Sequence, residues 1–192
     1  VMSEKLLRAI NVAAWVHDGQ VRKGTEIPYV SHAYGVMHLV SQQPAVREDV
    51  MIAALLHDVL EDAPERYNAA MMEADFGDEV LELVRRLTKD SSLSTWKMRA
   101  DDYLSRIPDA PLAMLYIAAS DKVHNLSSIL NDYEVHGESV WDRFNSSKEE
   151  QVWWYGEVYR AIYRRLDELG VVRVPIMDRY GVLIIQLHKT LS

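Results

Sequence analysis

Two imidazoles and two carboxylates follow or lie within apolar stretches of this sequence: His32, His57, Asp58 and Asp121. A buried ionisable group is unfavourable unless it is paired or binds a metal. Two imidazoles and two carboxylates, with water completing the shell, suit manganese, iron(II) or a related divalent ion better than calcium. A hydrogen-bonded core histidine would also explain His57 taken alone. Because three separate segments each contribute a ligand type, the pattern favours a divalent metal site.

Two further carboxylates, Glu61 and Asp62, follow the His57-Asp58 pair. If one helix continues through this segment, Glu61 lies on the same face as His57, one turn later. Carboxylates beside an activated water can act as general acid and base. A solvated acidic helix end before Pro64 would explain the same residues. We predict that Glu61 and Asp62 are catalytic.

Arg22 and Lys23 lie in a loop that is flanked by glycines. A solvated basic pair is the plain alternative, but in a chain of net charge −8 they are the evident local source of positive potential for a phosphate. Asn125 and Ser128 follow Asp121 along one helical face at i, i+4 and i+7. These two residues either line a substrate pocket or are structural polar groups.

Helices must position these groups, because apolar residues recur at helical spacing and strand-like alternation is scarce. We expect an all-α fold, with Ser31 capping the helix that carries His32 and one helix running from Val50 through Glu61. Other helices are expected at residues 6–17, 78–87, 100–107 and 112–128. Ser147 and Glu150 form a capping box for a long helix that ends at Gly170. Residues 131–147 are expected to be loop-rich, and the tail from 171 an extended arm with a short helix.

Composition narrows the class of protein. A chain of 192 residues with 48% hydrophobic residues can bury a core as one domain. The charge of −8 argues against nucleic-acid polymers and anionic membranes as partners. The absence of cysteine excludes thiolate metal sites and disulfides. With no apolar signal core and no stretch of about 18 apolar residues, we expect a cytoplasmic protein.

The order and spacing of four motifs resemble those of the RelA/SpoT-type alarmone hydrolase domain, especially its small stand-alone members. The motifs are His17-x-x-Gln20-x-Arg22-Lys23, Pro28-Tyr29-x-x-His32, Ala53-Ala54-Leu55-Leu56-His57-Asp58-x-x-Glu61-Asp62 and Asp121-Lys122-x-His124-Asn125-Leu126. The similarity spans about residues 4 to 169 and includes Phe76-Gly77 and Trp153-Trp154-Tyr155. It implies an HD-domain helical bundle at residues 1–170, with 171–192 as a C-terminal extension packed on the same domain.

The resemblance also implies an activity and a role for each site residue. The family binds one manganese ion and removes the 3′-pyrophosphate of ppGpp or pppGpp. Its pattern makes His32, His57, Asp58 and Asp121 the metal ligands, and Glu61 and Asp62 the residues that position or activate water. Arg22 and Lys23 would meet the nucleotide, and Asn125 and Ser128 would line the nucleoside pocket. This chain departs from the family at Ala33, where proline is usual, and at Ser127, where arginine is usual.

Two other functions remain open from the sequence. Ser127 removes a positive charge near the substrate, so the chain could be an HD phosphatase for another nucleotide, such as a nucleoside monophosphate or a nicotinamide dinucleotide phosphate. A nucleotide sensor without turnover is the alternative from a different class, although the complete ligand set argues against lost activity. A dinuclear oxygenase is disfavoured, because no second ligand set is evident among His38, His136 and His188. The oligomeric state is left open.

Overall fold

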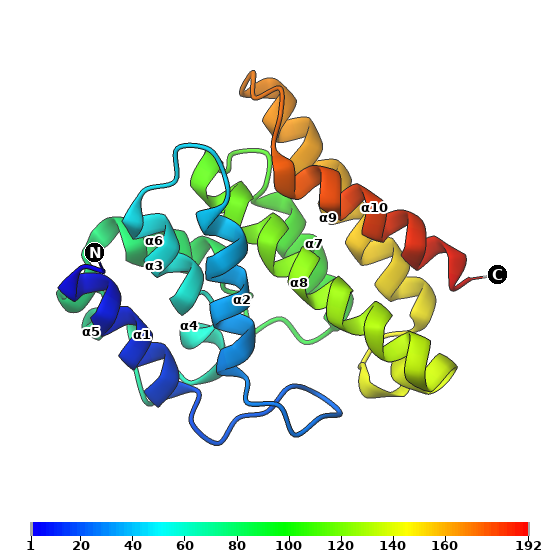
Figure 1. Cartoon of the computed structure of the whole chain (residues 1–192), viewed down its shortest axis with the longest axis horizontal. Helices are drawn as coiled ribbons and strands as arrows, with labels where there is room; N and C mark the ends of the chain where they lie inside the picture. Colours follow the sequence, from blue (N-terminus) through cyan, green and yellow to red (C-terminus); the bar gives the residue numbers. More distant parts are fainter. Residues whose placement is uncertain (1, 192) are drawn as a thin grey trace. The chain divides into compact units, whose positions relative to one another are not determined.

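The computed structural model describes residues 2–191, which form two compact units that divide between Lys89 and Asp90. Within these residues the regular structure is helical, and extended pairing is limited to an isolated bridge between Val21 and Pro28 (Figure 1). The all-α fold class is therefore confirmed. No helix in the described part of the chain combines the length and the hydropathy that crossing a bilayer requires.

The first unit is built around α3, which packs against α1, α2 and α6. Its helices are α1 (Glu4–Val16), α2 (Val30–Ser41), α3 (Glu48–Leu56), α4 (Val59–Asp62), α5 (Ala69–Phe76) and α6 (Asp78–Leu87). Residues 52–56 of α3 have no solvent exposure, as expected for a helix that is apolar on all sides. The helix thereby brings its last residues, and the His57-Asp58 pair after them, to the interior of the unit.

Two sequence predictions for this unit are wrong. Helix α2 begins at Val30 after Tyr29, without a side-chain cap, so Ser31 lies inside the helix instead of capping it. The predicted helix from Val50 through Glu61 is interrupted after Leu56, and α4 begins only at Val59. At the interruption the Asp58 carbonyl accepts hydrogen bonds from the amides of Glu61 (3.2 Å) and Asp62 (2.8 Å). Glu61 therefore belongs to a separate single-turn helix.

The second unit is organised along the long helix α8, which packs against the helices that follow it. Its elements are α7 (Trp96–Ser105), α8 (Leu112–His136), the 3-10 helix η1 (Gly137–Arg143), α9 (Lys148–Glu168) and α10 (Pro175–Lys189). The predicted loop at 131–147 is wrong, because α8 continues to His136 and η1 follows. Gly137, at φ 60°, has the left-handed backbone that ends α8 and that other residues adopt at a cost.

The capping box at the start of α9 is confirmed. The Glu150 amide donates to Ser147 Oγ (3.1 Å), and the Ser147 amide donates to Glu150 Oε2 (2.7 Å). The C-terminal tail is more helical than expected, because α10 contains 15 residues and begins with Pro175 in the first turn. It packs on α8 and α9, and the Tyr180 hydroxyl donates to the Tyr155 carbonyl (2.9 Å). The proposed domain limits at residues 170 and 171 stay a prediction.

Candidate metal and active site

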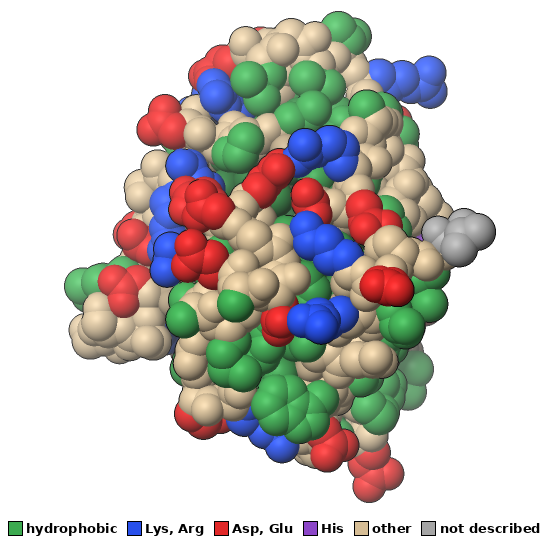
Figure 2. Space-filling view, turned by 90° about the vertical axis from the view of Figure 1, so that its left-hand side faces the viewer, with side chains coloured by type: hydrophobic (Ala, Val, Ile, Leu, Met, Phe, Trp, Pro, Cys, Tyr) green, Lys and Arg blue, Asp and Glu red, His purple; other side chains and the backbone are tan. Residues whose placement is uncertain are grey.

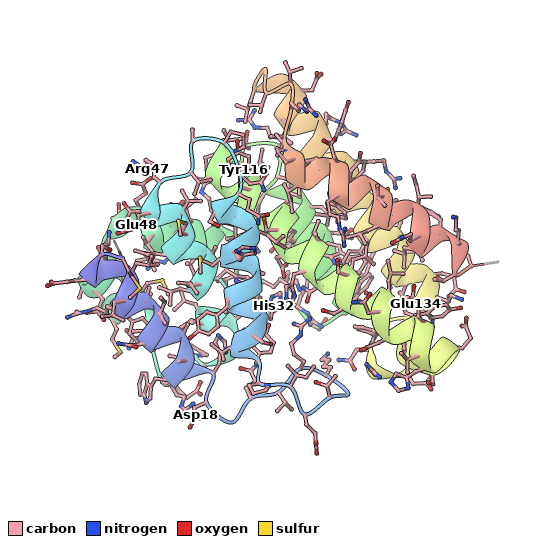
Figure 3. All side chains as sticks on the ribbon, viewed as in Figure 1. Asp18, His32, Arg47, Glu48, Tyr116 and Glu134 are labelled. Atoms are coloured by element: carbon pink, nitrogen blue, oxygen red, sulfur yellow. The ribbon has the colours of Figure 1, made fainter. Side chains whose placement is uncertain are left out.

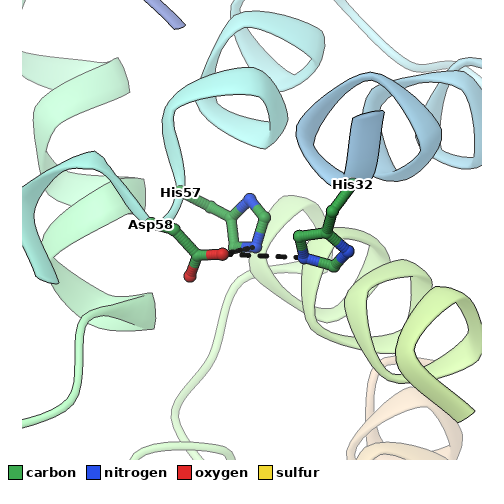
Figure 4. A group of neighbouring side chains, drawn as sticks. All are labelled: His32, His57 and Asp58. Carbon is green, nitrogen blue, oxygen red and sulfur yellow. Dashed lines mark ion pairs between the residues drawn. The ribbon is translucent and has the colours of Figure 1, made fainter. Parts of the chain in front are cut away.

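Three of the predicted ligands meet in the first unit (Figure 4). His32 comes from the first turns of α2, as Figure 3 also shows, and His57 and Asp58 come from the junction of α3 and α4. The Asp58 Oδ2 atom lies 3.0 Å from His57 Nε2 and 3.6 Å from His32 Nε2. One ligand atom from each residue lies within 4.8 Å of the others. The two imidazoles are buried, whereas Asp58 is half-buried.

The hydrogen bonding of His57 shows which nitrogen is available to a cation. Its Nδ1 lies 2.8 Å from the Ala54 carbonyl oxygen. Because a carbonyl only accepts, Nδ1 carries the proton and Nε2 keeps its lone pair. That lone pair faces the Asp58 carboxylate, an arrangement that is repulsive unless a cation or a proton lies between them. The donor set therefore fits a divalent cation and leaves coordination positions for other ligands.

Asp58 is surrounded by groups that favour its ionised form. Burial alone would raise the pKa of its carboxyl, but the positive charge and N–H groups that His57 and His32 present when protonated together outweigh burial and hold this pKa well below its ordinary value. The Tyr29 hydroxyl also donates a hydrogen bond to Asp58 Oδ2 (2.5 Å). Asp58 is thus a carboxylate across the ordinary pH range, as a metal ligand must be.

Glu61 and Asp62 occupy the single turn of α4, immediately after Asp58. Glu61 Oε2 accepts a hydrogen bond from the Lys89 amide (3.1 Å), and Asp62 Oδ2 accepts one from Gln20 Nε2 (2.8 Å). Both side chains reach solvent, yet neighbouring atoms desolvate the carboxyls enough to raise the pKa of each above its ordinary value. The negative charge of Asp58 acts in the same direction. A raised pKa makes a carboxyl better suited than an ordinary carboxylate to accept and return a proton.

Arg22 and Lys23 lie in a tight turn in the segment between α1 and α2. The Thr25 amide donates to the Arg22 carbonyl (3.0 Å), and Gly24 in the turn has φ 71°, a conformation that favours glycine. The Arg22 guanidinium lies over the Tyr29 ring, 5.6 Å from its centroid. Tyr29 thereby links the basic turn to Asp58.

Asp121, Asn125 and Ser128 lie on α8, in the second unit. The Asp121 carboxylate is held on both oxygens: Asn125 Nδ2 donates to Oδ1 (2.6 Å), and the buried Lys122 ammonium donates to Oδ2. Lys122 Nζ lies 4.9 Å from the Tyr103 ring centroid and 5.5 Å from that of Trp154. The Ser128 hydroxyl donates to the His124 carbonyl (3.0 Å), which is a structural contact within the helix.

Sequence reasoning assigned no site role to three residues that contact the predicted ones, Gln20, Tyr29 and Lys122, nor to His17, which lies one contact further away. Gln20 and Tyr29 contact Asp62 and Asp58, and Lys122 contacts Asp121. Gln20 in turn contacts His17. The available signal was their place inside the quoted motifs, beside residues that already had roles. Their side-chain partners are set by tertiary packing, which spacing does not reveal.

An all-helical protein with a histidine from one helix beside a His-Asp pair from another is of the HD type. The HD domain family matches this chain at residues 9–147, and the chain therefore belongs to that family. Within it, the chain is 33% identical to guanosine-3′,5′-bis(diphosphate) 3′-pyrophosphohydrolase MESH1 of Drosophila melanogaster, over 72% of this chain and 75% of that protein. It is 32% identical to the bifunctional (p)ppGpp synthase/hydrolase SpoT of Escherichia coli, over 66% of this chain but 18% of that larger protein.

Solved structures agree with these relationships. The protein lmo0812 of Listeria monocytogenes EGD-e is 28% identical, with a TM-score of 0.71 over 82% of this chain and 99% of that one. A metazoan orthologue of SpoT, described as hydrolysing ppGpp, is 27% identical, with a TM-score of 0.71 over 88% of this chain and 98% of that one. The fold expected from the resemblance is therefore confirmed, together with the family.

Proposed function

We propose that this chain is a manganese-dependent hydrolase that removes the 3′-pyrophosphate of ppGpp or pppGpp, giving GDP or GTP and pyrophosphate. The observation that carries the proposal is the convergence of His32, His57 and Asp58 next to two carboxyls with raised pKa values. The relatives named as (p)ppGpp hydrolases supply the substrate class.

His32, His57 and Asp58 would hold the ion through two Nε2 atoms and one carboxylate oxygen. Asp121 is proposed as a further ligand on the strength of its motif alone. In the structure its carboxylate pairs with Lys122 and Asn125. A bound divalent ion supplies Lewis acidity at phosphorus and lowers the pKa of water toward neutrality.

The chain's own carboxyls would move the protons. Glu61 and Asp62 take the proton of the water that attacks phosphorus and return one to the ribose 3′ oxygen as its bond to phosphorus breaks. Arg22 and Lys23 would bind the phosphates, and their placement on a glycine turn fixes the backbone that carries them. Asn125 and Ser128 are proposed to meet the nucleoside.

A small nucleotide fits the surface better than a nucleic-acid polymer does. On the face drawn in Figure 2, Lys and Arg side chains are interspersed with Asp and Glu. Together with the net charge of −8, this distribution does not favour a long phosphate backbone. Local cations at the 22–25 turn would serve a compact polyanion.

Product analysis of the manganese-loaded protein tests the proposal. Anion-exchange chromatography should show ppGpp converted to GDP and pyrophosphate, with His57→Ala as the inactive control. Ser127, where the resembling family has arginine, favours one second candidate, a phosphatase for a less charged nucleotide. Rapid hydrolysis of a nucleoside monophosphate or a nicotinamide dinucleotide phosphate, without cleavage of ppGpp, would establish that candidate instead. Nucleotide binding with no turnover of any compound would identify a sensor.

A further inference from the structure

A continuous set of hydrogen bonds leads from the end of α1 to Asp62. His17, the residue after α1, is buried, and its Nδ1 lies 2.7 Å from Gln20 Oε1. Gln20 Nε2 donates to Asp62 Oδ2 (2.8 Å). The three side chains come from two segments that are separated by more than 40 residues in the sequence. Their connection is therefore a property of the tertiary fold.

The chemistry of the amide makes this set directional. A glutamine amide has one acceptor oxygen and one donor nitrogen, so the face that accepts from His17 leaves the NH₂ group for Asp62. The Oε1 contact requires a proton on His17 Nδ1. The Nε2 contact requires an acceptor oxygen on Asp62. His17 and Asp62 thus both favour the same orientation of the Gln20 amide.

His17 does not gain stability from its second nitrogen. In the part of the chain that the structure describes, His17 Nε2 is buried without a hydrogen-bond partner. A buried polar atom without a partner is unfavourable, and an apolar side chain would fill this position without that cost. The useful feature of His17 is therefore its Nδ1–H group, which it donates to Gln20.

A residue that follows α4 in the sequence, Arg66, fixes the backbone around His17. The Arg66 guanidinium donates to the carbonyl oxygens of Val16 (2.8 Å), Trp15 (3.3 Å) and Asp18 (3.3 Å). Arg66 lies shortly after Asp62 in the sequence, and it provides hydrogen bonds for carbonyls at the C-terminal end of α1. The segment that carries His17 is thereby tied to the segment that follows Asp62.

We propose that His17 and Gln20 are positioning residues that act through the Asp62 carboxylate and hold it in the orientation needed for proton transfer. The inference rests on the proposed function, in which Asp62 handles protons. Neither residue needs to touch the nucleotide. Loss of either residue should therefore lower kcat and leave KM nearly unchanged.

Gln20→Leu and His17→Phe test the proposal, because the first removes both hydrogen bonds of the set and the second removes the bond between His17 and Gln20. We expect kcat to fall by up to about 10²-fold, as for other misoriented catalytic groups, with KM within about twofold of the wild-type value. His17→Asn keeps an N–H donor near Nδ1 and should restore most of kcat. The matched control is Gln42→Leu, which breaks the exposed His38–Gln42 contact at the C-terminal end of α2 (3.0 Å) and should change neither constant. A raised KM with unchanged kcat in Gln20→Leu would overturn the proposal.

A double-mutant cycle with Asp62→Asn identifies the residue through which Gln20 acts. If the proposal holds, Gln20→Leu has almost no further effect in the Asp62→Asn background. Multiplicative losses would overturn it. If ppGpp is not cleaved, the proposed function fails by itself, and the cycle is measured on whichever nucleotide is turned over.

A second measurement does not depend on turnover. Long-range ¹H–¹⁵N spectra of the imidazole rings should show a proton on His17 Nδ1 in the wild type and loss of this single tautomer in Gln20→Leu. A wild-type protein with the proton on Nε2 would overturn the inference, whatever the substrate proves to be.

Discussion

The two units of the molecule neutralise a carboxylate in different ways. In the first unit, Asp58 faces two imidazole nitrogens and accepts a hydrogen bond from a tyrosine hydroxyl. In the second unit, Asp121 pairs with the buried ammonium of Lys122. The Asp58 arrangement needs a bound cation, whereas at Asp121 the side chain of the next residue, Lys122, is the cation. A metal ion would therefore supply at Asp58 the charge that Lys122 already supplies at Asp121.

The largest effect is expected from removing the nearer of the two imidazoles that face Asp58, that of His57. His57→Ala should abolish turnover and reduce bound metal below one-tenth of an equivalent, because the remaining donors no longer surround a cation. The increase in thermal stability that metal gives the wild type should disappear as well. Elemental analysis and thermal melts with and without metal measure both effects. Full metal occupancy in the variant would contradict the ligand assignment.

The next largest effect concerns chemistry without loss of metal. Glu61→Gln and Asp62→Asn should each lower kcat by about 10²–10⁴-fold, since proton transfer by a positioned carboxyl contributes that much. Metal content should stay at the wild-type level, because neither residue belongs to the His32, His57 and Asp58 group. Steady-state kinetics beside elemental analysis separates the two properties. Turnover within a few-fold of wild type in both variants would return the pair to an ordinary acidic helix end.

Removing the Lys122 ammonium from the second unit should lower the stability of the fold. Lys122→Met leaves the buried Asp121 carboxylate without its ammonium partner and should lower the free energy of unfolding by about 3–5 kcal/mol. The matched control is Lys97→Met, because Lys97 also pairs with an aspartate and lies over a tryptophan ring, but at the surface. That control should cost less than about 1 kcal/mol. Urea unfolding of metal-free protein gives both values, and equal losses would show that burial of the Asp121 pair has no special weight.

The smallest effect is a pH dependence at the edge of the first site. Burial raises the pKa of Glu61 in the folded protein, so folding disfavours its ionised form. The stability linked to the neutral form is complete below the ordinary glutamate pKa and is lost as pH rises through the folded value. Metal-free Glu61→Gln should thus be more stable than wild type at pH 7, by less than about 1 kcal/mol because the side chain reaches solvent.

Melts at pH 4 and pH 7 check this sign. The two proteins should differ less at pH 4 than at pH 7, because at pH 4 the wild-type carboxyl is mostly neutral in both the folded and the unfolded state. Glu65→Gln is the control, because Glu65 is an exposed glutamate in the segment after α4. A Glu61→Gln variant that is less stable than wild type at pH 7 would mean that the contact with the Lys89 amide outweighs the cost of burial.

Helix positions followed from the sequence where the apolar period was strong. The predicted helix at 78–87 coincides with α6, and the Ser147–Glu150 capping box is present. The interruption at His57-Asp58 could not be found in this way, because neither residue is a glycine or proline and the apolar period continues across them. Helix α5 was missed, since Ala69–Phe76 buries only Met72 and Phe76 and has a weak apolar stripe.

The features of the site also divide into those that the sequence predicts and those that depend on tertiary packing. The meeting of His32, His57 and Asp58 could be predicted, because imidazoles and carboxylates in apolar helices have few favourable partners. The pairing of Lys122 with Asp121 could not, because adjacent residues on a helix do not normally face each other. The long lysine side chain reaches back to its neighbour with its ammonium beside the rings of Tyr103 and Trp154. The two rings come from α7 and α9, whereas Lys122 lies on α8, so local spacing does not reveal this arrangement.

The interruption between α3 and α4 sets how this protein can diverge. Because the Asp58 carbonyl accepts hydrogen bonds from the amides of Glu61 and Asp62, the number of residues between the His57-Asp58 pair and these two carboxylates is fixed. One inserted residue would turn the following carboxylates by about 100°. The turn at residues 22–25 is also hydrogen-bonded, from the Thr25 amide to the Arg22 carbonyl, but it carries none of the proposed metal ligands. A new nucleotide preference is therefore expected to arise by grafting loops at that turn, with the His57–Asp62 segment inherited unchanged.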